Sequence, residues 1–105
     1  MKRVFVNLID NALEALTSSS EQHIKVSTKF DAPRETLIAE VADSGEGIPA
    51  TDFKRLFQPY FSTRGRGTGL GLAIVQRIVT EHGGKIRADN NAPHGARFII
   101  EIPVS

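Results

Sequence analysis

The chain has 105 residues, which fits one small domain and is too short for two ordinary hydrophobic cores. With 13 Lys and Arg against 12 Asp and Glu, the net charge is +1, which disfavours nucleic-acid-binding modules because these usually have a basic excess. The absence of Cys excludes disulfides, thiolate metal sites and cysteine nucleophiles. No apolar run approaches the roughly 20 residues of a membrane-spanning helix.

The first half of the chain predicts one helix and two strands. Residues 2–17 place their apolar side chains on one broad arc, which is typical of a helix that packs on a core. Residues 22–30 alternate between apolar and polar side chains, which predicts a half-buried strand. After a turn at 31–35, residues 36–42 form a second strand, antiparallel to the first because the connection is short.

The next segment, from Asp43 to Gly71, has little regular periodicity. We expect a short helix near 51–57, with Thr51 or Asp52 close to its N-terminal cap. Loops of this length in compact domains are usually functional lids or disordered segments, and the aromatic content here argues against disorder. Four aromatic side chains are expected to anchor the segment on the core: Phe53, Phe57, Tyr60 and Phe61.

The last part of the chain predicts a second helix and a hairpin. Residues 70–82 have an apolar side and a polar side, and the pair Gly83 and Gly84 signals the end of a helix. Residues 85–89 and 96–102 form two further strands. The whole pattern predicts an α/β two-layer sandwich, with a mixed, mostly antiparallel sheet covered on one face by helices.

Two asparagines, Asn7 and Asn11, lie one turn apart at the border of the apolar arc of the first helix. They can be solvated surface amides. Asparagine is, however, unfavourable inside helices, so the pair also fits the polar wall of a pocket. There its amide oxygens could bind a hard cation such as Mg²⁺.

Two glycine-containing segments have different chemistry. Asp43 directly follows a strand, where it either caps a turn or accepts a hydrogen bond from an exocyclic amine beside Gly45 and Gly47. The segment 65–72, GRGTGLGL, opens the second helix. Its backbone amides at a helix N-terminus suit phosphate, and the alternative is a flexible hinge. Arg64 and Arg66 could reach phosphate oxygens or be solvated surface charges.

Four segments, taken in chain order, resemble four motifs of the ATP-binding catalytic domain of sensor histidine kinases. NLIDNALEAL (7–16) is similar to the asparagine box of that family, and VADSGEGIP (41–49) is similar to its first glycine box. LFQPYFSTR (56–64) resembles its phenylalanine box, and GTGLGLAIV (67–75) resembles its second glycine box. The resemblance covers nearly the whole chain, and the residues of these motifs are most similar to those of the nitrogen-regulation type of sensor kinase.

The resemblance implies roles for individual residues. Asp43 would accept the adenine amino group of ATP, with Gly47 lining the ring. Asn11, with Asn7 as a co-ligand or water-positioning residue, would hold Mg²⁺ against the phosphates, which makes both the expected catalytic and metal-binding residues. Residues 50–66 would form a mobile ATP lid between helices and sheet. The other expected nucleotide-binding residues are Gly45, Ile48, Arg64, Gly67, Thr68, Gly69, Leu70 and Gly71.

The implied activity is that of a protein-histidine kinase catalytic domain occupying residues 1–105. It would donate the γ-phosphoryl group of Mg-ATP to a histidine on a separate helical dimerisation domain, from which a response-regulator aspartate receives it. The implied location is the bacterial cytoplasm, in a parent protein that can be membrane-anchored. The domain itself would contact neither nucleic acid nor membrane.

The sequence departs from the family pattern in two ways. Where many members have a basic residue after the second box asparagine, this chain has Glu14, so we expect Arg64 or Arg66 to meet the terminal phosphate. The family domain also begins with a strand before the first helix, and a phosphoacceptor histidine lies upstream. We therefore expect an N-terminally clipped piece of a longer kinase, with a sheet one strand short, that binds nucleotide without autophosphorylating.

Two other functions are compatible with the sequence. A related ATPase switch of the gyrase, heat-shock chaperone or mismatch-repair type usually has Glu at the position of Asn7, so Asn7 and the phenylalanine box argue against it. A non-catalytic interaction domain that retains the fold is disfavoured by the four intact boxes.

Overall fold

The computed structural model describes residues 2–16, 23–45, 47–59, 71–90 and 95–104. The two predicted long helices and the four predicted strands are confirmed to within two residues at either end, with the predicted end residues 17, 22 and 70 lying outside the described part. In chain order the elements are α1 (Lys2–Leu16), β1 (Ile24–Asp31), β2 (Thr36–Asp43), the 3-10 helix η1 (Ala50–Asp52), α2 (Gly71–Glu81), β3 (Lys85–Asn90) and β4 (Ala96–Pro103).

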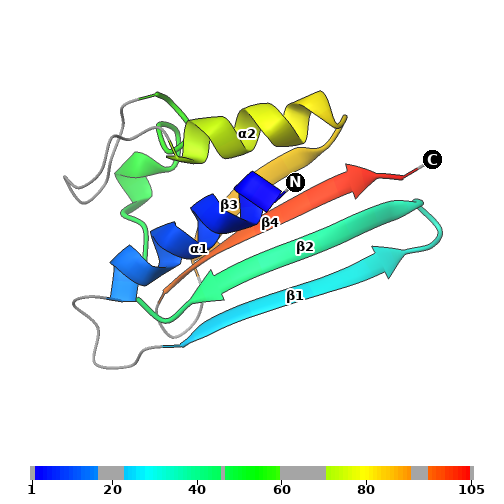
Figure 1. Ribbon diagram of the computed structural model, residues 1–105. Helices are drawn as coiled ribbons and strands as arrows, with labels where there is room; N and C mark the ends of the chain where they lie inside the picture. The colour runs from blue at the N-terminus through cyan, green and yellow to red at the C-terminus, as the bar shows by residue number, and fades with distance from the viewer. Residues whose placement is uncertain (1, 17–22, 46, 60–70, 91–94, 105) are drawn as a thin grey trace.

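The four strands form one sheet in the order β1-β2-β4-β3, and all three pairings are antiparallel. Both helices lie on the same face of this sheet, which confirms the two-layer α/β sandwich (Figure 1). The central pairing joins β2 to β4, and its last register pair is Ala42 with Arg97. This pairing places Asp43 opposite Ala96, although the two residues are far apart in the sequence.

The hydrophobic core fills the space between the helices and the sheet. Helix α1 lies over β2, and α2 lies beside α1 and over β3. Val4 and Leu8 of α1 and Val75 and Val79 of α2 are fully buried. Burial of side chains of this size contributes roughly 1.5–3 kcal/mol each, so the apolar arcs seen in the sequence account for the helix positions.

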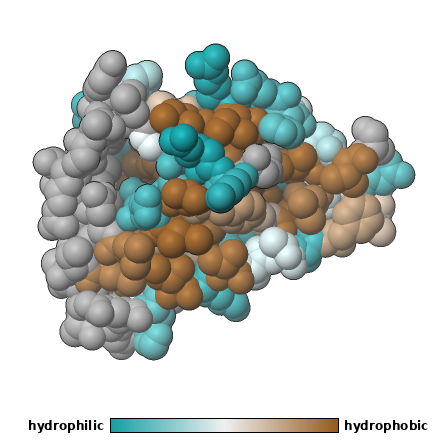
Figure 2. Space-filling model, in the orientation of Figure 1, coloured by the Kyte–Doolittle hydropathy of each residue, from teal (hydrophilic) through white to brown (hydrophobic). Residues whose placement is uncertain are grey.

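Strand β1 is covered less completely than its neighbours, because α1 lies over β2. Val26 and Phe30 of β1 face the helix layer but stay exposed, as do Val6 and Leu13 on α1. Figure 2 shows apolar side chains reaching the surface on the side where α1 lies. Among the described residues, no helix is long and apolar enough to cross a membrane.

The predicted short helix near 51–57 is only partly present. The structure has the 3-10 helix η1, followed by turns with the hydrogen bonds Arg55 N to Asp52 O and Gln58 N to Arg55 O. Its N-terminal cap is Pro49, which makes no side-chain capping bond, and Thr51 and Asp52 lie close to this cap, within the 3-10 helix itself. The helix is of the 3-10 type because Asp52 N donates to Pro49 O, which closes a tighter turn than an α-helix has.

Aromatic residues of the same segment anchor it on the core, as predicted. Leu56 is buried, and Phe53 and Phe57 pack against the core cluster. The ring of Phe57 meets that of Phe98 on β4 edge to face, with centroids 6.4 Å apart. Tyr60 and Phe61 lie outside the described residues.

The end of the sheet formed by the β1–β2 turn is closed by side-chain and backbone contacts. Arg34, in this turn, pairs with Asp31 at 2.8 Å and with Glu101 of β4 at 2.7 Å. Val104 N also donates to the Glu35 carbonyl. The opposite end of the sheet, where β2 ends and β4 begins, is left for the site described below.

Candidate functional site

Asp43 is the last residue of β2 and the most informative polar group of the described chain. Its side chain alternates onto the helix face of the sheet, and the residue is only 3% exposed. The carboxylate oxygen Oδ1 accepts hydrogen bonds from Gly45 N at 2.9 Å and from Ala96 N at 3.2 Å. Among the described residues no group donates to Oδ2. Asp43 is therefore a fixed, buried carboxylate with one oxygen available to accept a hydrogen bond.

The loop after Asp43 is held against the end of β3. Asn90 is the last residue of that strand, and its side chain makes two hydrogen bonds to one backbone position. Ile48 N donates to Asn90 Oδ1 at 2.8 Å, and Asn90 Nδ2 donates to Ile48 O at 3.1 Å. A Cβ added at Gly47 would lie 3.0 Å from Asn90 Oδ1 and 3.2 Å from the Gly95 carbonyl oxygen. Glycine at position 47 avoids these tight contacts, and its φ of +82° is a conformation that side-chain-bearing residues rarely adopt.

The start of β4 is packed equally tightly against the end of β2. Gly95 has a φ of +111°, a conformation that side-chain-bearing residues rarely adopt. A Cβ at this position would lie 2.9 Å from the carbonyl carbon of Asp43 and still closer to its oxygen. This close approach lets the next residue, Ala96, direct its N–H at the Asp43 carboxylate.

A second group of residues joins the two helices. Asn7 and Asn11 are half-buried on one face of α1. Asn7 Nδ2 donates to the carbonyl of Gly71, the first residue of α2, at 3.3 Å. The asparagine face of α1 therefore lies beside the beginning of α2. Figure 1 shows that α2 begins and β2 ends toward the same side of the molecule.

This arrangement matches known proteins along the full length of the chain. Residues 1–105 match the family described as histidine kinase-, DNA gyrase B-, and HSP90-like ATPase. The chain belongs to this ATPase family. Among curated relatives, the sensor histidine kinase ZraS of Klebsiella oxytoca is 42% identical over 105 residues, which is 100% of this chain and 22% of ZraS. The chain thus spans about a fifth of the length of the relatives it matches.

Two solved structures have the same fold. A structure described as full-length ShkA in complex with AMPPNP has a TM-score of 0.84 at 26% identity, and the match covers 97% of this chain and 21% of that one. The histidine kinase ThkA in complex with the response regulator protein TrrA has a TM-score of 0.78 at 35% identity, over 99% of this chain and 28% of that one. The predicted resemblance to sensor histidine kinases is therefore confirmed.

Within this histidine kinase-like ATPase domain, the described residues fall into two groups. Asp43 lies with Gly45, Gly47 and Ile48 at the sheet end, and Asn7 and Asn11 lie on α1 beside Gly71. The roles assigned to them stay predictions. The remaining predicted nucleotide-binding residues lie outside the described part of the chain, as does the part of the predicted lid after residue 59. They are Arg64, Gly67, Thr68, Gly69 and Leu70.

Asn90, Gly95 and Ala96 were not identified from the sequence. All three belong to the second hairpin, and they meet the Asp43 loop only because β4 pairs with β2. The pair Asn90–Asn91 and Gly95 appear in the sequence only as signals of a turn. The sequence shows only a connection between the two strands of this hairpin, and the length of a connection does not determine which other loop its residues contact.

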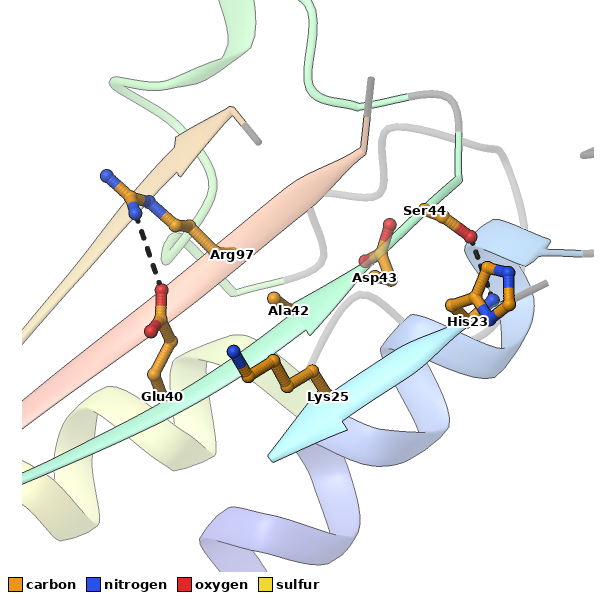
Figure 3. Close-up of a pocket in the computed structure, with 7 residues that line it drawn as sticks. All are labelled: His23, Lys25, Glu40, Ala42, Asp43, Ser44 and Arg97. Atoms are coloured by element: carbon orange, nitrogen blue, oxygen red, sulfur yellow. Dashed lines mark hydrogen bonds and ion pairs between the residues drawn. The ribbon is translucent and has the colours of Figure 1, made fainter. Parts of the chain in front are cut away.

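The opposite face of the sheet has a separate hollow of about 320 Å³ near the same end (Figure 3). Lys25, Glu40 and Arg97 project from three neighbouring strands on this face. Arg97 lies 3.5 Å from Glu40 and 3.3 Å from Asp89, and its Nε has no hydrogen-bond partner among the described residues. The hollow is lined by His23, Lys25, Glu40, Ala42, Asp43, Ser44 and Arg97.

Asp89 makes this network sensitive to acid. A hydrogen bond from Arg97, and then one from Asn90 N, lower the pKa of Asp89 below its ordinary value of 3.8. A carboxylate whose pKa is lowered by folding stabilises the protein above its unfolded pKa and loses that contribution as the pH falls through its folded pKa. Because the side chain is exposed, the contribution is small.

We therefore expect Asp89→Asn to lower the free energy of unfolding slightly at neutral pH, with the difference from the wild type disappearing below the ordinary Asp pKa. Urea unfolding from about pH 7 down to about pH 2.5 measures this difference. A difference that stays constant across the series would contradict the assignment of the pair.

Proposed function

We propose that this domain binds Mg-ATP and, in a longer parent protein, donates the γ-phosphoryl group to a histidine on a separate helical dimerisation domain. A response-regulator aspartate would then receive the group. Membership of the ATPase family and the sensor kinase relatives support this function, as does the nucleotide analogue named in the ShkA structure. The response regulator named in the ThkA complex supports the downstream partner. A bacterial cytoplasmic location is part of the same proposal.

The observation that carries the proposal is the state of the Asp43 carboxylate. Its Oδ1 is held by two backbone N–H groups, so Oδ2 has a defined position. A carboxylate oxygen that is fixed in position and has no donor among the described residues suits an exocyclic amine, such as that of adenine, because hydrogen bonds to a charged acceptor are stronger than those between neutral groups. Gly45, Gly47 and Ile48 follow directly and would line the ring.

Asn7 and Asn11 fit a Mg²⁺ ion by the chemistry of their side chains. Mg²⁺ prefers oxygen ligands and usually keeps several waters while it also binds substrate phosphates. Because Asn7 uses its Nδ2 to contact Gly71, its Oδ1 is available for the cation or for a bound water. Mg²⁺ would supply neutralisation of phosphate charge, which is a large part of catalysis in phosphoryl transfer.

The phosphates would lie at the start of α2. Gly71 begins this helix, and N–H groups at a helix N-terminus attract anions. We propose that the preceding residues Gly67, Thr68, Gly69 and Leu70 add backbone amides there, that Arg64 supplies the cation for the terminal phosphate, and that residues 50–66 close over the nucleotide. Phe53 and Phe57 anchor the first part of that segment on the core.

Calorimetry with ATP and Mg²⁺ tests the proposal. We expect Asp43→Asn to weaken ATP binding by about 10- to 100-fold, because the loss of a charge-assisted hydrogen bond has an effect of this size. The side-chain oxygen of the asparagine would still accept hydrogen bonds from the two backbone N–H groups. Its NH₂ group would then face the adenine amine, so two donors would meet.

Glu40→Gln is the matched control, since it makes the same carboxylate-to-amide change on the same strand but on the opposite face of the sheet. It should leave the affinity unchanged. Absence of ATP binding by the wild type, or equal binding by Asp43→Asn, would refute the proposed function.

A further inference from the structure

Asn90 connects the loop that follows Asp43 to a strand that is remote in the sequence. Its amide bonds both the N–H and the carbonyl of Ile48, 42 residues away, at 2.8 and 3.1 Å. These bonds are partly buried, and they satisfy both backbone groups of one loop residue. The loop thus has an attachment at Gly45, through Asp43, and a second attachment at Ile48.

The three strands involved place their contacts in one row. Asn90 of β3 lies opposite Ala96 of β4 in the register, and Ala96 N donates to Asp43 at the end of β2. Gly47 lies beside them: a Cβ at this position would lie 3.0 Å from Asn90 Oδ1 and 3.2 Å from the Gly95 carbonyl oxygen. Movement of the Asn90 side chain therefore changes the position of the loop backbone relative to the Asp43 carboxylate.

We propose that Asn90 is a positioning residue that determines the preference of the site for adenine over other purines. This inference rests on the proposed ATP binding and extends it. Adenine presents an amine to Asp43 Oδ2, whereas guanine presents a carbonyl oxygen at the same place and would be repelled by the carboxylate. This discrimination requires the base to be held in one orientation, and we expect the Gly47–Ile48 backbone, which Asn90 holds, to line the ring.

The effect of Asn90 is thus on selectivity as well as on stability. Asn90→Ala removes both bonds to Ile48 and frees the loop to move away from the sheet end. We expect ATP binding to weaken about fivefold to tenfold, as for the loss of one or two partly buried hydrogen bonds. GTP binding should change little, so the ratio of the two affinities falls.

A second variant separates the two bonds. Asn90→Asp keeps the shape and the acceptor for Ile48 N, but it places an oxygen against the Ile48 carbonyl. It should therefore also lower the ratio of ATP to GTP affinity. Asp89→Asn is the matched control, because this neighbouring side chain lies on the opposite face and pairs with Arg97, and the amide oxygen of the variant can still accept the hydrogen bond that Asn90 N donates to it. It should leave the ratio unchanged.

The experiment is calorimetry of the 105-residue chain with Mg²⁺ and either ATP or GTP, accompanied by urea unfolding of each variant without nucleotide. A lower ratio in both Asn90 variants, with the Asp89 control unchanged, supports the proposal. If ATP binding and GTP binding weaken equally, or if stability falls while the ratio of ATP to GTP affinity is unchanged, the proposal for Asn90 is overturned and the proposed function still stands. A wild type that binds no ATP overturns both, and that result is distinct because it appears without any mutation.

Discussion

Gly95→Ala is expected to lower the free energy of unfolding by at least about 3 kcal/mol, since a strained φ and a backbone overlap add together. The residue has a φ of +111°, and its Cβ would lie 2.9 Å from the Asp43 carbonyl carbon. The carbonyl carbon and oxygen of Asp43 are backbone atoms and cannot rotate away as a flexible side chain could. The first residues of β4 must therefore move away from β2. Urea unfolding followed by circular dichroism measures the change.

The control is the same substitution at Gly71, where an added Cβ has no heavy atom within 4 Å. Gly71 begins α2, and alanine is the better helix former by about 1 kcal/mol in a helix interior. Gly71→Ala should therefore leave stability unchanged or raise it. Equal unfolding midpoints for Gly95→Ala and the wild type would show that the backbone contact at the sheet end is not as close as described.

Leu8→Ala is expected to cost about 2–5 kcal/mol of stability, the range measured for large-to-small changes in cores. Leu8 is completely buried among the side chains of α1, α2 and the sheet, so its removal leaves a cavity that its rigid neighbours cannot fill. For a small domain with a typical stability of about 5–15 kcal/mol, this is a large fraction of the total. Chemical unfolding measures it directly.

Leu13→Ala provides the comparison on the same helix. Leu13 is 52% exposed, and alanine favours the helix, so we expect a change of less than about 1 kcal/mol. The difference between the two leucines tests the direction in which α1 presents its apolar arc. Similar losses for both variants would contradict the packing of α1 on the sheet.

The sequence was sufficient to predict the elements of the fold, because their periodicity is local. The apolar arc through Val4 and Leu8 predicted α1, and the alternation through Phe98 and Ile100 predicted β4. It did not predict the strand order β1-β2-β4-β3, since the β2–β4 pairing depends on contacts between distant residues. The short helix predicted near 51–57 is instead a 3-10 helix over Ala50–Asp52 followed by turns, and the sequence did not predict this because the tighter turn has no distinct residue pattern.

The candidate site was predictable to a similar degree. Asn7 and Asn11 stand out because asparagine is unfavourable inside a helix. Asp43 stands out because it follows a strand and comes directly before the segment with Gly45 and Gly47. Asn90 and Ala96 do not stand out, because their partners are distant in the sequence. Asn90 contacts Ile48, 42 residues away, and Ala96 contacts Asp43, 53 residues away. Their positions follow from the sheet register, which is visible only in three dimensions.

The turn closed by Arg34 has a practical consequence for experiments. It lies at one end of β2 and Asp43 lies at the other, and seven residue steps in a strand span about 23 Å. Ala32 and Pro33 are exposed in this turn. A fluorescent label attached there would be separated from the proposed nucleotide site by the full length of a strand, so it could follow binding without occupying any part of that site.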